Sequence, residues 1–305
     1  MREFLTAVTE YQFLRNALLT GALAGIACGV VGSYVVVRRI TYVAGGIAHC
    51  VLGGIGAAVY LQRAHGLAWA DPLLGALVAA LVAALTIGAV SIRAKQRVDA
   101  VIGALWAVGM AVGVVFLSQT PGYGEDIMSY LFGNILMVTS RDLWLVGALD
   151  AVVVTIGLLF YHQFLSISFD EEFAETRGVP VELYFMLLLV LTALTVVLLV
   201  TVVGIVLVIA LLTIPAAVAG NFTSRLSHMM ALSAALSIAF TTLGLAVSYG
   251  PDLPAGATII LIAGGTYLVV AVGKRLAARR RARRRPGDTT LSVSDTPTGG
   301  RCGTD

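Results

Sequence analysis

A succession of apolar runs, each about 20 residues long, constrains this chain of 305 residues more than any other feature of its sequence. A bilayer core holds no water, so a backbone that crosses it must satisfy its own hydrogen bonds as a helix or a closed barrel. Barrel strands alternate in polarity and these runs do not. The sequence therefore predicts an all-α, polytopic transmembrane helix bundle. The predicted spans cover residues 14–37, 43–62, 72–92, 99–118, 143–161, 183–202, 203–221, 229–249 and 255–273.

The stretch between Glu182 and Arg225 decides the number of spans, because it contains no charged residue. As one helix it would measure about 63 Å, twice the thickness of the hydrocarbon core. We therefore predict two spans that turn near Gly204, which gives eight or nine spans in all.

Lys and Arg residues near the span ends predict the orientation, because cytoplasmic ends carry the excess of these residues. Arg38, Arg39, Arg93 and Arg225 follow or precede alternate spans, so we expect these ends in the cytoplasm and the N-terminus outside. The apolar segment Tyr130–Asp142 is too short to cross, and we interpret it as an outer-surface or partly re-entrant segment. The predicted divisions are an extracytoplasmic segment at residues 1–12, a transmembrane domain at 13–273 with a cytoplasmic helix at about 168–181, and a basic, then disordered, cytoplasmic tail at 274–305.

The positive charge of the chain is concentrated in one segment. The net charge is +3, yet the segment from Lys274 to Arg285 carries eight Lys or Arg residues, which leaves −5 for the rest. We interpret this segment as a cytoplasmic tail beside anionic membrane lipid, since no folded module for reading nucleic acid accompanies it. Nucleic-acid binding is the weaker alternative.

His49 lies in the glycine-rich span "YVAGGIAHCVLGGIGAAVY". An imidazole is a good ligand for borderline metals, and an ionisable group at membrane depth marks an ion pathway by default. A hydrogen bond to a neighbouring helix is an equally simple explanation.

Two carboxylates are further candidates for the pathway. Asp150 lies halfway along a span, where it either makes a structural hydrogen bond or lines the pathway. Asp99 lies where a loop enters a helix, and favourable interaction with the helix N-terminus explains it adequately.

The segment "SFDEEFAETRGVPVELY" starts at Ser168 and predicts a short acidic helix on the cytoplasmic side that ends at Gly178. It is either a solvated loop or a docking surface for a cytoplasmic partner. The chain has no GxxxxGK[ST], HExxH or GxSxG motif, so we expect a transport subunit and not an enzyme.

The order of six motifs resembles the permease subunit of the bacterial zinc and manganese ABC importers. The motifs are "LRNALLTGALAGIACGVVGSYVVVRRITYVAGGIAHCVLGGIG", "DAVIGALWAVGMAVGVVF", "MSYLFGNILMVTSRDL", "SFDEEFAETRGVPV", "ALLTIPAAVAGNFTSRL" and "LPAGATIIL", and together they extend over residues 12–273.

This resemblance implies a homodimeric, multi-pass permease in the inner (plasma) membrane of a bacterium. Its implied partners are two cytoplasmic ATP-binding cassette ATPase subunits and an extracytoplasmic metal-binding protein, with a zinc or manganese ion as cargo and no permanently bound cofactor. ATP hydrolysis belongs to the ATPase. The implied coupling residues are Phe169, Asp170, Glu171, Glu172, Phe173, Glu175, Arg177 and Gly178, and the implied metal path contains His49, Asp150 and Asp99.

The helix with His49 departs from the family's usual G-D-A-x-S-H pattern, because Gly45 replaces the aspartate and Ala48 the serine. An Asp and a His at i and i+4 share a helix face and hold one ion jointly. Zinc tolerates the loss of a hard carboxylate better than manganese does, so the pattern favours zinc as the cargo.

The sequence therefore predicts the membrane pathway of an ATP-driven importer for a divalent transition metal. The loops near residues 122–129 and 249–254 are expected to form its outer mouth. The alternatives are cargo of iron or a metal chelate, or an ion-gradient-driven secondary transporter that uses Asp150 and His49 as a relay.

Overall fold

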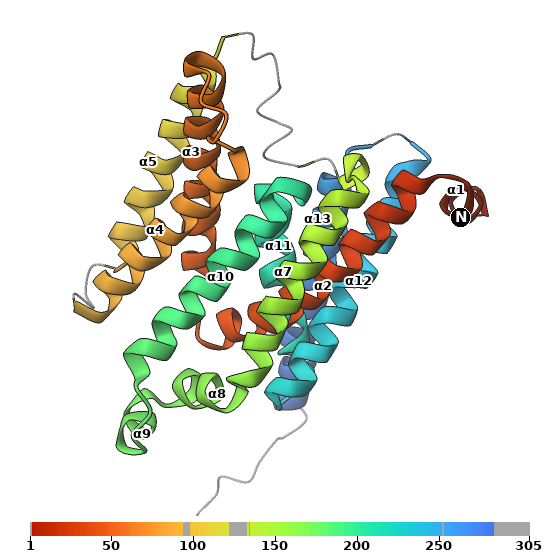
Figure 1. The fold of residues 1–305 in the computed structure, drawn as a ribbon. Coiled ribbons are helices and arrows are strands. Elements are labelled where there is room, and N and C mark those ends of the chain that lie inside the picture. Colours follow the sequence, from red (N-terminus) through yellow and green to blue (C-terminus); the bar gives the residue numbers. More distant parts are fainter. Residues whose placement is uncertain (1, 94–97, 122–132, 134, 252, 284–305) are drawn as a thin grey trace, which may run out of the picture. The chain divides into compact units, whose positions relative to one another are not determined.

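The computed structural model describes residues 2–93, 98–121, 133, 135–251 and 253–283. The described residues form helices joined by short turns and contain no strand, which confirms the all-α prediction (Figure 1). The helices are α1 (Arg2–Glu10), α2 (Gln12–Val37), α3 (Thr41–His65), α4 (Pro72–Arg93), α5 (Val98–Ser118), η1 (Ile135–Met137), α7 (Ser140–Leu159), α8 (Tyr161–Phe169), α9 (Glu171–Thr176), α10 (Val181–Val203), α11 (Ile205–Ala219), α12 (Leu226–Tyr249) and α13 (Ala255–Arg283).

Eight of the described helices are long and apolar enough to cross a membrane. They are α2, α3, α4, α5, α7, α10, α12 and α13. The predicted break at Gly204 is confirmed, because this glycine has a φ of +87° and separates α10 from α11. The predicted span at 203–221 is the shorter helix α11 of 15 residues, which is only about 22 Å long.

Two short helices were not predicted. α1 precedes the first span and buries Phe4 and Ala7. The predicted span at 143–161 ends at Phe160, where α7 stops and α8 begins. The predicted helix at 168–181 is thereby divided into the end of α8, the six-residue α9 and a turn at Gly178, whose φ is +76°.

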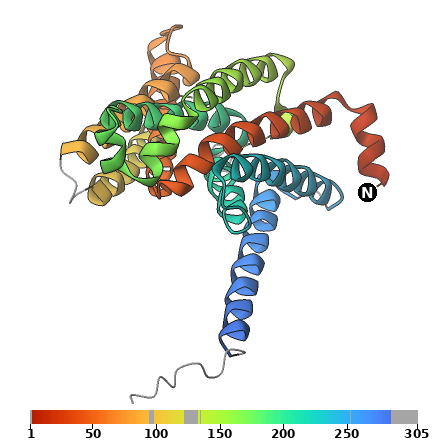
Figure 2. The same cartoon turned by 90° about the horizontal axis from the view of Figure 1, so that it is seen from below.

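Residues 1–267 form one compact unit, and residues 268–305 form a second unit that starts within α13. In the first unit, α3, α4 and α5 pack on one another, and α2 packs on α7, α11 and α12. α10 contacts members of both groups. α2 and α12 run side by side in Figures 1 and 2.

Small residues permit the close approach of these helices. A Cβ on Gly54 of α3 would lie 2.1 Å from the carbonyl oxygen of Gly75 of α4, and a Cβ on Gly29 of α2 would lie 2.6 Å from that of Ala234 on α12. Close backbone contact of this kind replaces the water-driven core of soluble proteins in membrane bundles.

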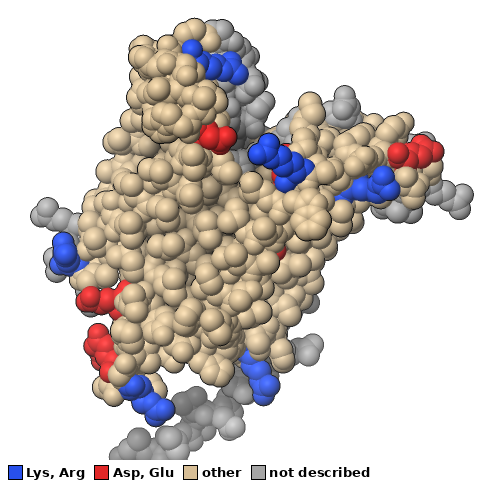
Figure 3. Space-filling view, in the orientation of Figure 1, with Lys and Arg blue, Asp and Glu red and all other residues tan. Residues whose placement is uncertain are grey.

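The helix ends of the first unit gather into two sets. One set, which we call the Arg38 end, includes a cleft that is lined by Arg38, Ile92, Val98 and Glu171. The other set, which we call the Asn16 end, includes Asn16, whose side-chain amide donates a hydrogen bond to the Val138 carbonyl at 3.2 Å. The face of the molecule in Figure 3 carries its charged side chains toward the margins of the view and a broad uncharged middle.

The loops predicted on the outer side fall only partly within the described residues. The segment Tyr130–Asp142 is described at residue 133 and from residue 135 onward, and there it forms the short η1 and the start of α7. The expected outer mouth at residues 122–129 lies outside the described residues.

Candidate ion pathway and coupling segment

His49 lies near the middle of α3 and is buried, with 9% of its surface exposed. Its Nδ1 atom is buried and makes no hydrogen bond to the described residues. Its ring packs against the indole of Trp106 on α5, with the ring centroids 4.1 Å apart and the planes inclined by 54°. The imidazole is therefore held in place by an aromatic neighbour, and the backbone of Gly45 also lies near enough to interact with it electrostatically.

Gly45 lies one helical turn before His49 and faces the same indole. A Cβ on Gly45 would lie 3.4 Å from Cζ3 of Trp106 and 3.8 Å from Cη2. The space that a longer side chain would use at this position is thus bounded by the indole. Trp106 was not among the predicted site residues, because a tryptophan within an apolar run gives no sign of which helix it faces.

A cavity of about 440 Å³ opens beside Gly45 and Trp106. Gly45, Trp106 and Tyr42 line it together with residues from α11 and α13. The residues that line it include four with hydroxyl groups, Thr41, Tyr42, Thr213 and Tyr267. Aromatic rings and hydroxyls can accept a cation that has kept part of its hydration shell.

Asp150 is buried at 3% exposure, and its Oδ1 makes no hydrogen bond to the described residues. It lies near enough to Cys28 on α2 to interact electrostatically with that thiol. α7, which carries Asp150, packs on α2 and α10, whereas His49 on α3 faces α5. Asp150 and His49 therefore lie at different helix–helix interfaces.

Asp99 lies in the first turn of α5 and is exposed at the Arg38 end. The position suits a carboxylate because the helix N-terminus carries a partial positive charge. No group of three or more His, Cys, Asp and Glu side chains within the described residues could hold a metal ion. His49, Asp150 and Asp99 are thus three separate positions and not one chelating cluster.

The predicted coupling segment is built from α8 and α9. The Asp170 carboxylate caps α9 and accepts a hydrogen bond from the Phe173 N–H at 2.9 Å. Ala174 is the buried residue of α9, whereas Phe169 and Phe173 are 67% and 59% exposed. The other predicted coupling residues, Glu172, Glu175, Arg177 and Gly178, are also exposed. Exposed aromatic rings are enriched at surfaces that bind another protein.

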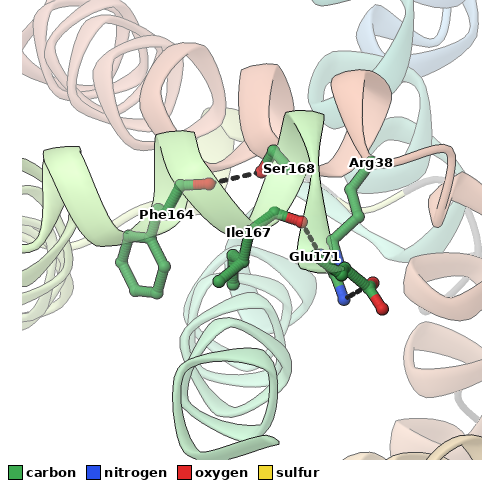
Figure 4. Close-up of polar contacts among 5 residues, drawn as sticks. All are labelled: Arg38, Phe164, Ile167, Ser168 and Glu171. Carbon is green, nitrogen blue, oxygen red and sulfur yellow. Dashed lines mark hydrogen bonds and ion pairs between the residues drawn. The ribbon is translucent and has the colours of Figure 1, made fainter. Parts of the chain in front are cut away.

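Arg38 anchors this segment to α2 (Figure 4). It follows the last residue of α2, donates to the Ile167 carbonyl of α8 and forms an ion pair with Glu171 of α9. Its guanidinium also lies 4.5 Å from the centre of the Phe185 ring on α10. Burial lowers the pKa of Arg38, and the carboxylate of Glu171 opposes that change. The sequence marked Arg38 only as an indicator of orientation.

The α8 turn that receives Arg38 is itself fixed by a local hydrogen bond. The Ser168 hydroxyl donates to the Phe164 carbonyl at 2.6 Å, and Phe164 is fully buried (Figure 4). The Phe164 ring packs edge-on against Tyr34 of α2, with centroids 5.1 Å apart. α8 is therefore tied to α2 by an aromatic contact as well as by the arginine.

Comparison with known proteins matches residues 10–274 to the model of the ABC 3 transport family. An uncharacterized membrane protein of Synechocystis sp. is 42% identical, with 90% of this chain and 95% of the relative covered. The manganese import system permease protein ScaB of Streptococcus gordonii is 30% identical, with 88% of this chain and 94% of the relative covered. The solved structure of PsaBC from Streptococcus pneumoniae in complex with Fab has a chain that is 32% identical, with a TM-score of 0.77 and coverage of 88% and 94%.

Proposed function

The chain belongs to the ABC 3 transport family, and on that basis we propose that it is the permease of an ATP-driven importer for a divalent transition metal. It is a multi-pass protein of the bacterial inner (plasma) membrane, with eight helices suited to crossing it. Membership of an ABC family favours a transport subunit driven by a separate ATPase over an ion-gradient-driven carrier.

The observation that carries this proposal is the buried imidazole of His49 within a family-matched membrane bundle. An imidazole at this depth can bind an ion that passes α3. A single ligand binds weakly, and weak binding suits a pathway because the ion must also leave.

The partners in this proposal follow from the two ends of the first unit. In this proposal the exposed Phe169 and Phe173 form the docking surface for the cytoplasmic ATPase, so the Arg38 end faces the cytoplasm and the Asn16 end faces outward. An extracytoplasmic metal-binding protein delivers the ion at the Asn16 end, and two copies of the chain form the complete permease.

Manganese is the first candidate for the cargo. The relative ScaB is named for manganese import and aligns with 88% of this chain. Zinc is the second candidate, because Gly45 removes the hard carboxylate that manganese prefers and leaves one imidazole. The likeness to ScaB extends along the whole membrane domain, whereas the zinc argument depends on one missing ligand, so we rank manganese above zinc.

Uptake into proteoliposomes tests the function and the cargo together. The chain would be reconstituted with its ATPase and binding protein, and radioactive manganese would be supplied with ATP. We expect ATP-dependent accumulation that a tenfold excess of unlabelled manganese suppresses more strongly than zinc or iron does. Stronger suppression by zinc than by unlabelled manganese would replace manganese with zinc. Absence of ATP-dependent uptake when radioactive manganese, zinc and iron are supplied in turn would reject the importer.

A further inference from the structure

Arg38 occupies the junction between the coupling segment and the hairpin of α2 and α3. The backbone N–H of Arg38 donates a hydrogen bond to the Tyr34 carbonyl at 2.9 Å and so closes the last turn of α2. Arg39 follows with a positive φ of +60°, and α3 begins at Thr41. His49 lies on α3, about two helical turns after that start. The backbone path from the Arg38 guanidinium to the imidazole therefore contains one tight turn and two turns of helix.

The side chain of Arg38 contacts three other elements at once. Its guanidinium binds a carbonyl on α8 and a carboxylate on α9, and it faces an aromatic ring on α10. The Arg38 side chain is 9% exposed, whereas the Glu171 side chain is 51% exposed. The arginine is thus embedded in the membrane unit, and its counter-charge is carried by the exposed helix that we assign to ATPase docking.

A largely buried cation that loses its carboxylate is destabilised, because the cost of removing its charge from water is then less well compensated. Displacement of α9 therefore has two outcomes. Either Arg38 follows Glu171 and draws the end of α2 and the start of α3 with it, or the ion pair breaks at high cost. The tight turn at Arg39 and the packed end of α2 favour movement as a unit.

We propose that Arg38 is a positioning residue that transmits the displacement of α9 to the α2–α3 hairpin and so to His49. This inference rests on the proposed function, in which the ATPase moves α9. It adds that the ion pair between Arg38 and Glu171 is the mechanical connection between nucleotide-driven motion and the pathway helix. A purely structural arginine would hold the fold but would not govern the response of α3 to ATP.

The test reads the motion of α3 directly, so that it does not depend on which ion is carried. A chain with Cys28, Cys50 and Cys302 replaced by alanine would receive Gly45→Cys and be assembled with its ATPase. The reaction of that cysteine with a charged thiol reagent would be timed with and without ATP. With Arg38 intact we expect ATP to change the rate about tenfold, and with Arg38→Gln we expect no change.

Arg93→Gln is the matched control, because Arg93 is an exposed arginine at the same end. It should retain the full response to ATP. Glu171→Gln is the second variant, since it leaves the Arg38 bond to the Ile167 carbonyl and is the milder change if Arg38→Gln fails to assemble. It should reduce the response to about threefold or less.

The charge exchange Arg38→Glu with Glu171→Arg should restore part of the response that Arg38→Gln removes, which a merely space-filling role would not produce. An ATP response that survives in both Arg38→Gln and Glu171→Gln would overturn the inference, as would a Gly45→Cys chain with Arg38 intact whose cysteine never responds to ATP. Loss of the response in the variants of an assembly that carries no metal would reject the proposed function and retain the connection.

Discussion

The surroundings of His49 and the segment α8–α9 are built in opposite ways. Around His49, helices meet through glycines, the ring packs on Trp106, and the ionisable group is nearly buried. Along α8–α9 the aromatic and acidic side chains face outward, and a six-residue helix depends on the Asp170 cap. A pathway needs a fixed ligand in dry surroundings, whereas a docking segment needs accessible side chains and freedom to move.

Because the two regions differ in this way, we expect substitutions in one to leave the other unaffected. A change at α8–α9 should disturb assembly with the ATPase and leave the packing at His49 intact. A change at α3 should disturb the ion and leave assembly intact. Arg38 is the exception, because it contacts α9 and also lies at the junction between α2 and α3.

The largest effect is expected from Phe169→Ala combined with Phe173→Ala. Exposed aromatic anchors at a protein interface typically contribute about 2 kcal/mol or more each, so co-purification with the ATPase should be lost. Co-purification through a tag on the ATPase measures this. The exposed Leu183→Ala is the control, and retention of the complex by the double variant would show that α8–α9 is not the docking surface.

A smaller effect is expected from Gly45→Asp, which restores a carboxylate one turn before His49. Two ligands on one helix face hold a metal ion better than one, and a hard carboxylate favours manganese over zinc. We expect the ratio of manganese to zinc uptake to rise about tenfold, together with a destabilisation of about 1–3 kcal/mol because the carboxylate is buried beside Trp106. Competition uptake and thermal unfolding measure the two effects, and an unchanged ratio would remove Gly45 from the determinants of metal choice.

The smallest effect is expected from removing residues 287–305. The sequence of this segment is polar and contains no apolar run, so uptake and co-purification should stay within about twofold of the full chain. The same uptake and tag assays measure it. A large transport defect would assign the tail a role that the comparison of the two regions leaves out.

The spans were predictable because long apolar runs admit few structures in a bilayer. The break at Gly204 followed from length alone, since one helix from Glu182 to Arg225 would be twice as long as the membrane core is thick. α1 and α8 were missed because each has nine residues, too few for periodicity to separate a helix from a loop.

The sequence indicated individual residues of the candidate site, but it did not indicate which residues contact one another. His49 and Asp150 were conspicuous because ionisable groups are costly at membrane depth. Their separation, and the contact of His49 with Trp106, depend on which helices pack together, and that is decided by small residues spread along the chain. The pairing of Arg38 with Glu171 joins residues 133 positions apart, and no local pattern indicates it.

The most direct test of the central claim measures manganese uptake and ATP hydrolysis together in proteoliposomes that contain His49→Ala. His65→Ala is the control, because His65 is exposed at the end of the same helix. We expect His49→Ala to lower uptake by about tenfold or more while ATP hydrolysis and assembly persist, and His65→Ala to change none of the three. Uptake by His49→Ala at the rate of the unmodified protein would contradict an ion pathway past this imidazole.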